Sequence, residues 1–219
     1  MRKVILLAIL FIALSNYCFA QDNEIPRNKK EFSSKAGIKA GYNINKLAGE
    51  KSPNVNFDNK SGFMVGGFFS PSSKSGFGYR TELVFSRQGF SYDDGGIRQD
   101  VQTDYIYAPQ LSTFTIGNFL QLQAGAQIGY LLKSSLKSES ASSEEEKVTE
   151  FMNRFDTGAA FGFELYPLRR LIIGSRYNLS FGKLYEQSMT APSPSPFPFD
   201  PTKVKGRNAV LQFFAGVRL

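Results

Sequence analysis

Residues 120–132 alternate between apolar side chains and polar or small ones with a period of two. Every even position from Leu120 to Leu132 is apolar, while the odd positions from Gln121 to Gly129 are glutamine or glycine. Such alternation predicts a β-strand with one apolar and one polar face. A tilted strand of about 9–11 residues crosses a bilayer, whereas a typical globular strand has about 5–6 residues. This strand is therefore long enough to span a membrane.

Similar patterns recur along the chain and predict eight strands in all. The predicted strands are residues 35–46, 61–70, 77–90, 101–115, 120–132, 154–165, 171–184 and 207–219. The register of the second strand stays open, because that segment is apolar and rich in glycine. The fourth strand alternates less cleanly, and Pro109 within it cannot donate a ladder hydrogen bond.

The connections between these strands alternate between two lengths. Short turns are predicted at residues 71–76, 116–118 and 166–170, and long polar loops at residues 47–60, 91–100, 133–153 and 185–206. Single-chain outer-membrane barrels have an even number of strands, short periplasmic turns and long extracellular loops. The sequence therefore predicts an all-β fold, an eight-stranded antiparallel up-and-down transmembrane β-barrel over residues 35–219. Both ends of the barrel domain are expected on the periplasmic side.

The polar faces of the predicted strands carry charges of both signs. Their candidate lumen residues are Arg80, Glu82, Gln110, Gln121, Gln123, Gln127, Asp156, Glu164, Arg176, Gln212 and Arg218. These side chains could form a selectivity filter or gate for a small solute, or a packed polar network that plugs the lumen. The interior of an eight-stranded barrel is just wide enough for side chains to fill it, which favours the packed network.

Residues 1–20 have the layout of a secretory signal peptide. Arg2 and Lys3 precede an apolar run over residues 4–14, and the small residue Ala20 ends the segment. The apolar run is shorter than the roughly 20 residues that a spanning helix needs. The sequence therefore predicts export to the outer membrane of a Gram-negative bacterium.

The exported chain is predicted to start at Gln21. Residues 21–34 are charged and lack any period, so we expect a flexible periplasmic lead-in. Cys18 could mark a lipoprotein, but the bulky Tyr17 precedes it where lipoprotein signals carry a small residue. The lipoprotein interpretation is therefore disfavoured.

The composition excludes several kinds of chemistry. Removal of Arg2 and Lys3 would reduce the 26 basic side chains to 24, which against 19 acidic ones leaves a net charge of +5. The basic residues are scattered and form no dense block, so no nucleic-acid partner is expected. The exported chain would contain no His and no Cys, which removes His-based nucleophile systems and the common zinc and copper ligands. No enzymatic activity and no cofactor are predicted.

Two long loops have biased compositions. Residues 134–147 are rich in Ser and Glu, and residues 191–201 contain five prolines. The acidic run could contact a cation or lipopolysaccharide, and the proline-rich run could dock a partner. Loops are generally solvated and variable, which favours plain surface loops. Protein partners are nevertheless expected, if anywhere, at the loops of residues 133–153 and 185–206.

Three short stretches resemble one known family. They read Tyr-Arg-Thr-Glu-Leu-Val-Phe-Ser-Arg-Gln-Gly at residues 79–89, Phe-Asp-Thr-Gly at residues 155–158 and Ile-Ile-Gly-Ser-Arg-Tyr-Asn-Leu at residues 172–179. They resemble the "porin family" outer-membrane β-barrel domain proteins of Bacteroidota, which include a PorT-like component of the type IX secretion and gliding machinery. The resemblance implies an eight-stranded barrel with no demonstrated pore and no catalytic residues to transfer. Many barrels end in an aromatic residue, whereas this chain ends in Leu219.

Three functions remain open. The first is a small integral outer-membrane barrel, in contact with outer-membrane lipid, with a structural, adhesive or machinery-associated role through its long loops. The second is a narrow porin-like channel for small solutes. The third, a secreted lipocalin-like carrier, would place its apolar face inside the barrel.

The predicted faces of residues 120–132 can be tested with charged substitutions. We expect Leu122→Arg to cost about 2–4 kcal/mol of folding free energy if Leu122 faces lipid near mid-membrane, and Gln123→Arg to be tolerated better. The measurement is the unfolding equilibrium of each variant in lipid vesicles. If both variants were equally harmless, the assignment of faces would be wrong.

Overall fold

The computed structural model describes most of the predicted barrel. The described residues are 35–50, 57–72, 76–94, 97–138, 146–185, 197 and 205–219. The predicted signal peptide and lead-in lie outside them, as do residues 139–145 of the acidic loop and most of the proline-rich run. No helix within the described part of the chain is long and apolar enough to cross a membrane.

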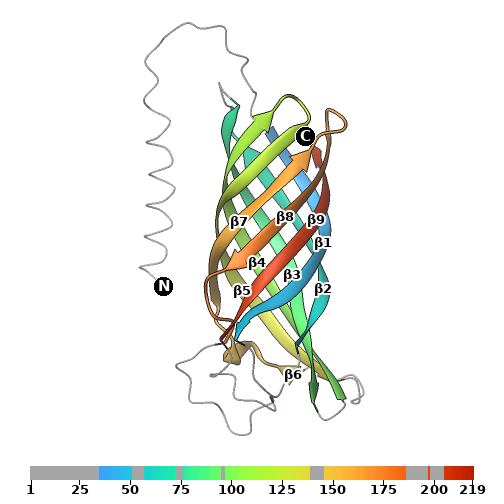
Figure 1. Ribbon diagram of the computed structural model, residues 1–219, viewed down its shortest axis with the longest axis vertical. Coiled ribbons are helices and arrows are strands. Elements are labelled where there is room, and N and C mark those ends of the chain that lie inside the picture. Colours follow the sequence, from blue (N-terminus) through green and yellow to red (C-terminus); the bar gives the residue numbers. More distant parts are fainter. Residues whose placement is uncertain are drawn as a thin grey trace, which may run out of the picture. The chain divides into compact units, whose positions relative to one another are not determined.

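Eight long strands form a closed antiparallel ring (Figure 1). They are β1 (Lys35–Glu50), β2 (Phe57–Ser70), β3 (Phe77–Asp94), β4 (Ile97–Ile116), β5 (Leu120–Ser138), β7 (Phe155–Leu165), β8 (Leu171–Ser180) and β9 (Lys205–Arg218). Each strand pairs with its neighbours along the chain, and β1 pairs with β9 to close the ring. The predicted up-and-down topology is confirmed.

Two short elements follow β5 at one end of the ring. The two-residue strand β6 (Glu146–Lys147) pairs with β5, and the 3₁₀ turn η1 (Thr149–Phe151) comes directly after it. Both lie at the end of the barrel that carries the long loops, opposite the C-terminus in Figure 1. We call this the loop end, and the opposite end, with the short turns, the turn end.

Side chains alternate between the lumen and the outer surface as the period of two predicts. On β5, Leu122 and Ile128 are 43% and 60% exposed, whereas Gln121 and Gln123 are buried. The same alternation holds on β7, where Phe161 faces outward and Glu164 is buried. The apolar face lies outside and the polar face inside, so the lipocalin-like alternative is wrong.

The fourth strand forms despite Pro109. Pairing between β4 and β5 continues through Pro109 and Gln127, but the register between β3 and β4 skips Ala108 and Pro109. The missing N–H of proline is thus accommodated by a local gap on one side of the strand.

The strands at the loop end run further than predicted. β3, β4 and β5 contain 18, 20 and 19 residues, so most of the loop predicted at residues 91–100 is a hairpin of paired strands. These extensions enclose apolar side chains, which we call the loop-end cluster. It consists of Leu47, Phe90, Tyr92, Val101, Tyr105, Tyr107, Leu131, Leu136, Val148, Met152, Leu184, Tyr185 and Phe197. Burial of this surface stabilises strand pairing beyond the length that crosses a bilayer.

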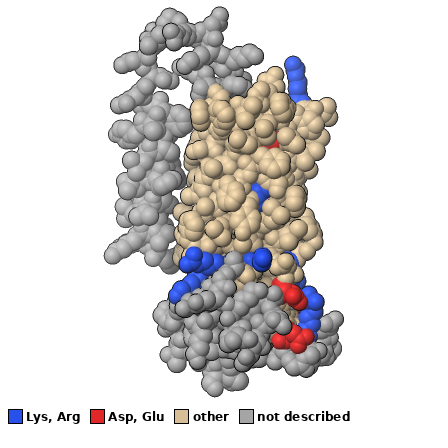
Figure 2. Space-filling view, in the orientation of Figure 1, with Lys and Arg blue, Asp and Glu red and all other residues tan. Residues whose placement is uncertain are grey.

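The outer wall is apolar up to a boundary near the loop end. Figure 2 shows Lys and Arg atoms at the lower end of the wall, whereas the wall above them carries few charged atoms. The exposed side chains of Lys46, Lys133, Arg154 and Arg207 lie at this boundary. Charged side chains are costly in hydrocarbon and tolerated at the interface, so these residues mark the loop-end limit of the apolar belt.

The position of each residue within the belt sets the expected cost of a charge there. Leu122 lies close to the turn end, whereas Ile128 lies nearer the middle of the belt on β5. We therefore correct the earlier expectation: Ile128→Arg should cost about 2–4 kcal/mol, and Leu122→Arg less. The measurement is the free energy of unfolding of each variant by guanidinium in lipid vesicles. The folded fraction at each guanidinium concentration is obtained by electrophoresis of unheated samples, in which the folded barrel migrates separately from unfolded protein. A larger cost for Leu122→Arg would contradict the placement of the belt.

Candidate functional site in the lumen

The carboxylate of Glu82 lies inside the lumen between two cations. Lys39 Nζ donates to Glu82 Oε1 at 2.8 Å, and the Arg176 guanidinium binds both carboxylate oxygens at 2.6 and 2.9 Å. The three side chains come from β1, β3 and β8, and all are buried. This bidentate contact of Arg176 is the strong form of the Arg–carboxylate pair, and it also fixes the orientation of both groups.

A second buried ion pair lies beside the first. Arg80 Nη1 donates to Glu164 Oε1 at 2.6 Å, and Arg80 Nη2 donates to Gln121 Oε1 at 2.8 Å. The Tyr166 hydroxyl lies 2.7 Å from Glu164 Oε2 and 2.9 Å from Gln121 Oε1. Arg80 and Glu164 come from β3 and β7, on different sides of the ring.

The two ion pairs form one network, which we call the charged layer. Arg80 and Glu82 point into the lumen from the same strand, with Nη1 and Oε1 4.0 Å apart. Gln123 Oε1 accepts a hydrogen bond from Arg176 at 2.6 Å. The charged layer consists of Lys39, Arg80, Glu82, Gln121, Gln123, Glu164, Tyr166 and Arg176. It ties the neighbouring strands β5, β7 and β8 to β1 and β3, which are not paired with them or with each other.

The charged layer also rests on aromatic rings that point inward. Lys39 Nζ lies 4.5 Å from the centroid of the Phe214 ring, and the Arg80 guanidinium lies 4.4 Å from that of Phe68. The Phe214 ring lies against Gly174, where a Cβ atom would approach its Cζ to 2.6 Å. A side chain at position 174 would therefore push the ring out of place beneath the cations.

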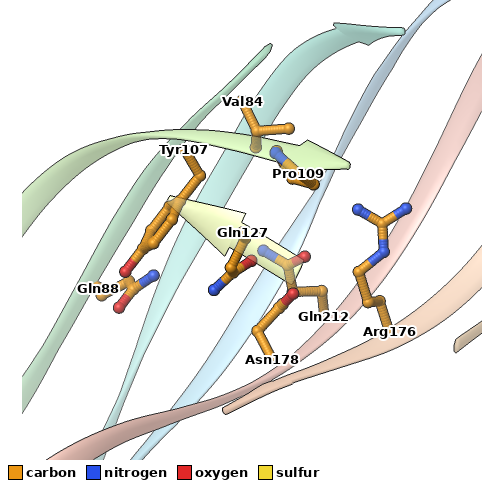
Figure 3. A pocket seen from close by; sticks show the side chains of 8 residues that line it. All are labelled: Val84, Gln88, Tyr107, Pro109, Gln127, Arg176, Asn178 and Gln212. Atoms are coloured by element: carbon orange, nitrogen blue, oxygen red, sulfur yellow. The ribbon is translucent and has the colours of Figure 1, made fainter. Parts of the chain in front are cut away.

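Polar side chains continue toward the loop end. Asn43 donates to Ser86 Oγ at 2.9 Å and accepts from Gln212 at 3.0 Å. Beside them lies a cavity of about 10 Å³ lined by Gln127, Asn178 and Gln212 among others (Figure 3). This volume accommodates about one water molecule.

Asp156 lies at the boundary between the polar lumen and the loop-end cluster. Its Oδ2 accepts hydrogen bonds from Tyr107 at 2.8 Å and Ser180 at 2.6 Å. Both donors are neutral hydroxyls. Beyond this level the loop-end cluster fills the interior. Among the described residues, buried side chains thus lie in the lumen at successive levels from the charged layer to the loop end.

The structure places the predicted lumen residues in four surroundings. Arg80, Glu82, Gln121, Gln123, Glu164 and Arg176 belong to the charged layer. Gln127 and Gln212 line the small cavity, Asp156 lies on its loop-end side, and Arg218 lies at the turn end with its guanidinium over the Tyr166 ring.

The prediction for Gln110 is wrong. Gln110 lies on the outer face of β4, where it bonds to the hydroxyls of Tyr79 and Thr81 on β3. The lumen-facing residues of β4 in this region include Tyr107 and Leu111, so the inward face here is apolar. Polarity alone therefore placed Gln110 on the wrong face of this strand.

Two members of the charged layer were absent from the candidates. Lys39 is on the polar face of the first predicted strand, so alternation alone could have identified it. Tyr166 falls in the predicted turn of residues 166–170, where no pattern indicates that its ring points into the barrel. Within the part of the chain that the structure describes, no cluster of three or more carboxylate, His or Cys side chains could hold a metal ion.

Comparison with known proteins agrees with this architecture. The family model described as outer membrane protein beta-barrel domain matches residues 19–186. The chain belongs to this family. The protein is thus an outer-membrane β-barrel, and its apolar belt contacts lipid.

The chain is also similar to solved outer-membrane barrels, and among the three named here only Neisserial surface protein A reaches a TM-score of 0.50. Neisserial surface protein A is 12% identical, with a TM-score of 0.50 over 87% of this chain and 100% of its own. Ail of Yersinia pestis is 19% identical, with a TM-score of 0.46 over 86% of this chain and 100% of its own. OprG of Pseudomonas aeruginosa is 12% identical, with a TM-score of 0.42 over 86% of this chain and 95% of its own. No curated protein matches this outer-membrane barrel in sequence.

The charged layer changes the expectation for Gln123→Arg. Gln123 already accepts a hydrogen bond from Arg176, so an arginine there would bring a second guanidinium to the same buried point. The substitution would remove an acceptor and add a cation to a layer that holds three cations and two carboxylates. We therefore expect Gln123→Arg to be destabilising rather than tolerated.

Loss of the central carboxylate should weaken the barrel. Glu82→Gln keeps the shape of the side chain but leaves Lys39 and Arg176 buried without their counter-charge, at an expected cost of about 3–5 kcal/mol. The measurement is the free energy of unfolding in guanidinium. Glu146→Gln, in the exposed strand β6, is the matched control and should change it by less than about 0.5 kcal/mol. Equal stability of Glu82→Gln and wild type would show that the layer is not a structural brace.

Proposed function

We propose that the protein is a non-conducting outer-membrane barrel that acts as a membrane-anchored platform and presents its loop end to a protein partner outside the cell. The observation that carries this proposal is that side chains fill the lumen at two levels. The buried ion pairs of the charged layer lie at one level, and the apolar loop-end cluster lies at the other. A small solute would have to displace both.

The length and packing of the loop end support a platform. β4 contains 20 residues, about twice the roughly 9–11 that a tilted strand needs to cross the bilayer. The added length projects beyond the boundary marked by Lys46, Lys133, Arg154 and Arg207. Strands that extend past the membrane with a packed interior form a stiff base for binding surfaces.

Segments between the strands are also fastened to this base. Met152 and Tyr185 form an isolated β-bridge, and the Asn153 side-chain amide donates to the carbonyl oxygens of Lys183 at 2.6 Å and Tyr185 at 3.1 Å. Val148 and Tyr185 are completely buried. Residues 152–153 and 183–185 are thereby held together, so the exposed side chain of the adjacent Glu150 is attached to a fixed base.

Among platform roles, the resemblance to the Bacteroidota "porin family" favours a machinery-associated one. That family includes a component of the type IX secretion machinery. In a structural or adhesive role the same loop end would bind a different partner from the one it binds in a secretion machine. None of these roles requires catalysis or a cofactor.

A narrow porin-like channel is the competing function, and conductance separates the two. Folded wild-type protein should show no discrete current steps in planar bilayers, because the charged layer and the loop-end cluster block the path. Electrophoresis of the same preparation with and without heating is the control: a band of folded protein that disappears on heating verifies that the inserted protein is a barrel. Current steps that change in size in Arg80→Ala would overturn the proposal in favour of a channel.

Site-specific photo-crosslinking in intact cells tests the platform itself. A photoreactive residue at Lys147 or Glu150, both exposed at the loop end, should give a discrete protein adduct. The same residue at Leu168, exposed in the turn between β7 and β8, is the matched control at the other end. Protein adducts from position 168 alone would place the partner in the periplasm and contradict the proposal.

A further inference from the structure

A second concave surface lies at the turn end of the lumen, on the periplasmic side of the charged layer. Its volume is about 430 Å³. We call it the periplasmic vestibule, and the residues that matter to its chemistry are Lys35, Thr115, Asn118, Tyr166, Arg169 and Arg218. Tyr166 is shared with the charged layer, so the ion pairs of the lumen lie directly behind the vestibule.

Positive charge dominates the vestibule. Lys35 begins β1, Arg218 ends β9, and Arg169 is exposed in the turn between β7 and β8. No carboxylate lines the vestibule among the residues that the structure describes. Three cations therefore share one concave surface.

The charged layer behind the vestibule does not neutralise it. Glu164 already accepts hydrogen bonds from Arg80 and Tyr166, and Glu82 is engaged by Lys39 and Arg176. The layer itself holds three cations against two carboxylates. Because one more positive charge lies behind the vestibule, the field there favours an anion.

Arg218 is held in a position suited to binding. Its guanidinium carbon lies 3.5 Å from the centroid of the Tyr166 ring. Its Nε is buried and has no hydrogen-bond partner among the described residues. A buried donor without an acceptor is unfavourable, and an acceptor oxygen from a ligand would relieve it.

We propose that the periplasmic vestibule binds a phosphate group. Arginine guanidinium groups match phosphate oxygens with paired hydrogen bonds, and a lysine ammonium adds a point charge. The hydroxyl of Thr115 and the amide of Asn118 supply neutral polar groups at the same surface. The volume lies within the range of about 300–1,000 Å³ that is usual for small-ligand sites.

The phosphate can come from a phospholipid headgroup or from free phosphate. Apolar side chains at the turn end favour the headgroup, since Phe119, Leu168 and Leu219 are 60%, 66% and 84% exposed. Acyl chains of a lipid in the periplasmic leaflet could lie against them while its phosphate enters the vestibule. The vestibule is at the opposite end from the platform, so this site does not depend on the proposed function.

The test uses the full exported chain, folded in nanodiscs of zwitterionic phosphatidylcholine. One arm adds inorganic phosphate and measures heat of binding, and the other adds phosphatidylglycerol to the nanodiscs and counts retained lipids by native mass spectrometry. Saturable phosphate binding identifies free phosphate as a ligand, and one retained phosphatidylglycerol per barrel identifies the headgroup. The absence of both in folded wild type overturns the proposal.

Variants link the binding to the vestibule. Arg169→Gln, in an exposed turn, should fold normally and weaken binding at least tenfold, and Arg218→Lys should weaken it because the stacked guanidinium is lost. Arg154→Gln, exposed at the loop-end boundary, is the matched control and should bind within twofold of wild type. Equal weakening in Arg154→Gln and Arg169→Gln would indicate nonspecific attraction and would contradict the assigned site.

Discussion

The buried pairing of Glu82 with Lys39 and Arg176 is the interaction on which the interior of this barrel depends. A lone ionised side chain in a low-dielectric interior is very unfavourable, so each of these charges requires the others. Because the partners come from β1, β3 and β8, meeting this requirement draws strands on different sides of the ring toward one point. Arg80 and Glu164 form a second buried ion pair, which connects β3 and β7 in the same way.

The side chains that form these ion pairs also take up space in the lumen. Ion pairs that bridge a ring of eight strands occupy its cross-section, and the aromatic rings of Phe68 and Phe214 fill the space beneath the cations. Glycine at position 174 provides room for one of these rings. In the function that we propose, these ion pairs brace the barrel and close the path for solutes.

The interior of the barrel differs between its two ends. At the loop end the strands leave the membrane, and an apolar interior replaces the polar one and stabilises the projecting strands. At the turn end the charged layer lies next to the vestibule, whose cations line a concave surface without a carboxylate among the described residues. One end is thus suited to display a surface, and the other to attract an anion.

The local pattern of the chain was sufficient to predict which side chains face lipid and which face the lumen on most strands. Successive residues of a strand point to opposite faces, so the period of two assigned Arg80, Glu82, Gln121, Gln123, Glu164 and Arg176 to the inside without knowledge of their partners. The alternation of short and long connections likewise predicted the order and direction of the strands. These properties depend on neighbours along the chain.

The partners inside the lumen depend on closure of the ring. Glu82 and Arg176 are 94 residues apart, and only the tilt and stagger of the strands bring them to one level. The same closure turns Tyr166 into the barrel, leaves Gln110 outside, and gathers the loop-end cluster from strands and connections. The sequence by itself determined the two faces of each strand, because that choice is local. The tertiary structure decided which charges meet, because that choice depends on the geometry of the whole ring.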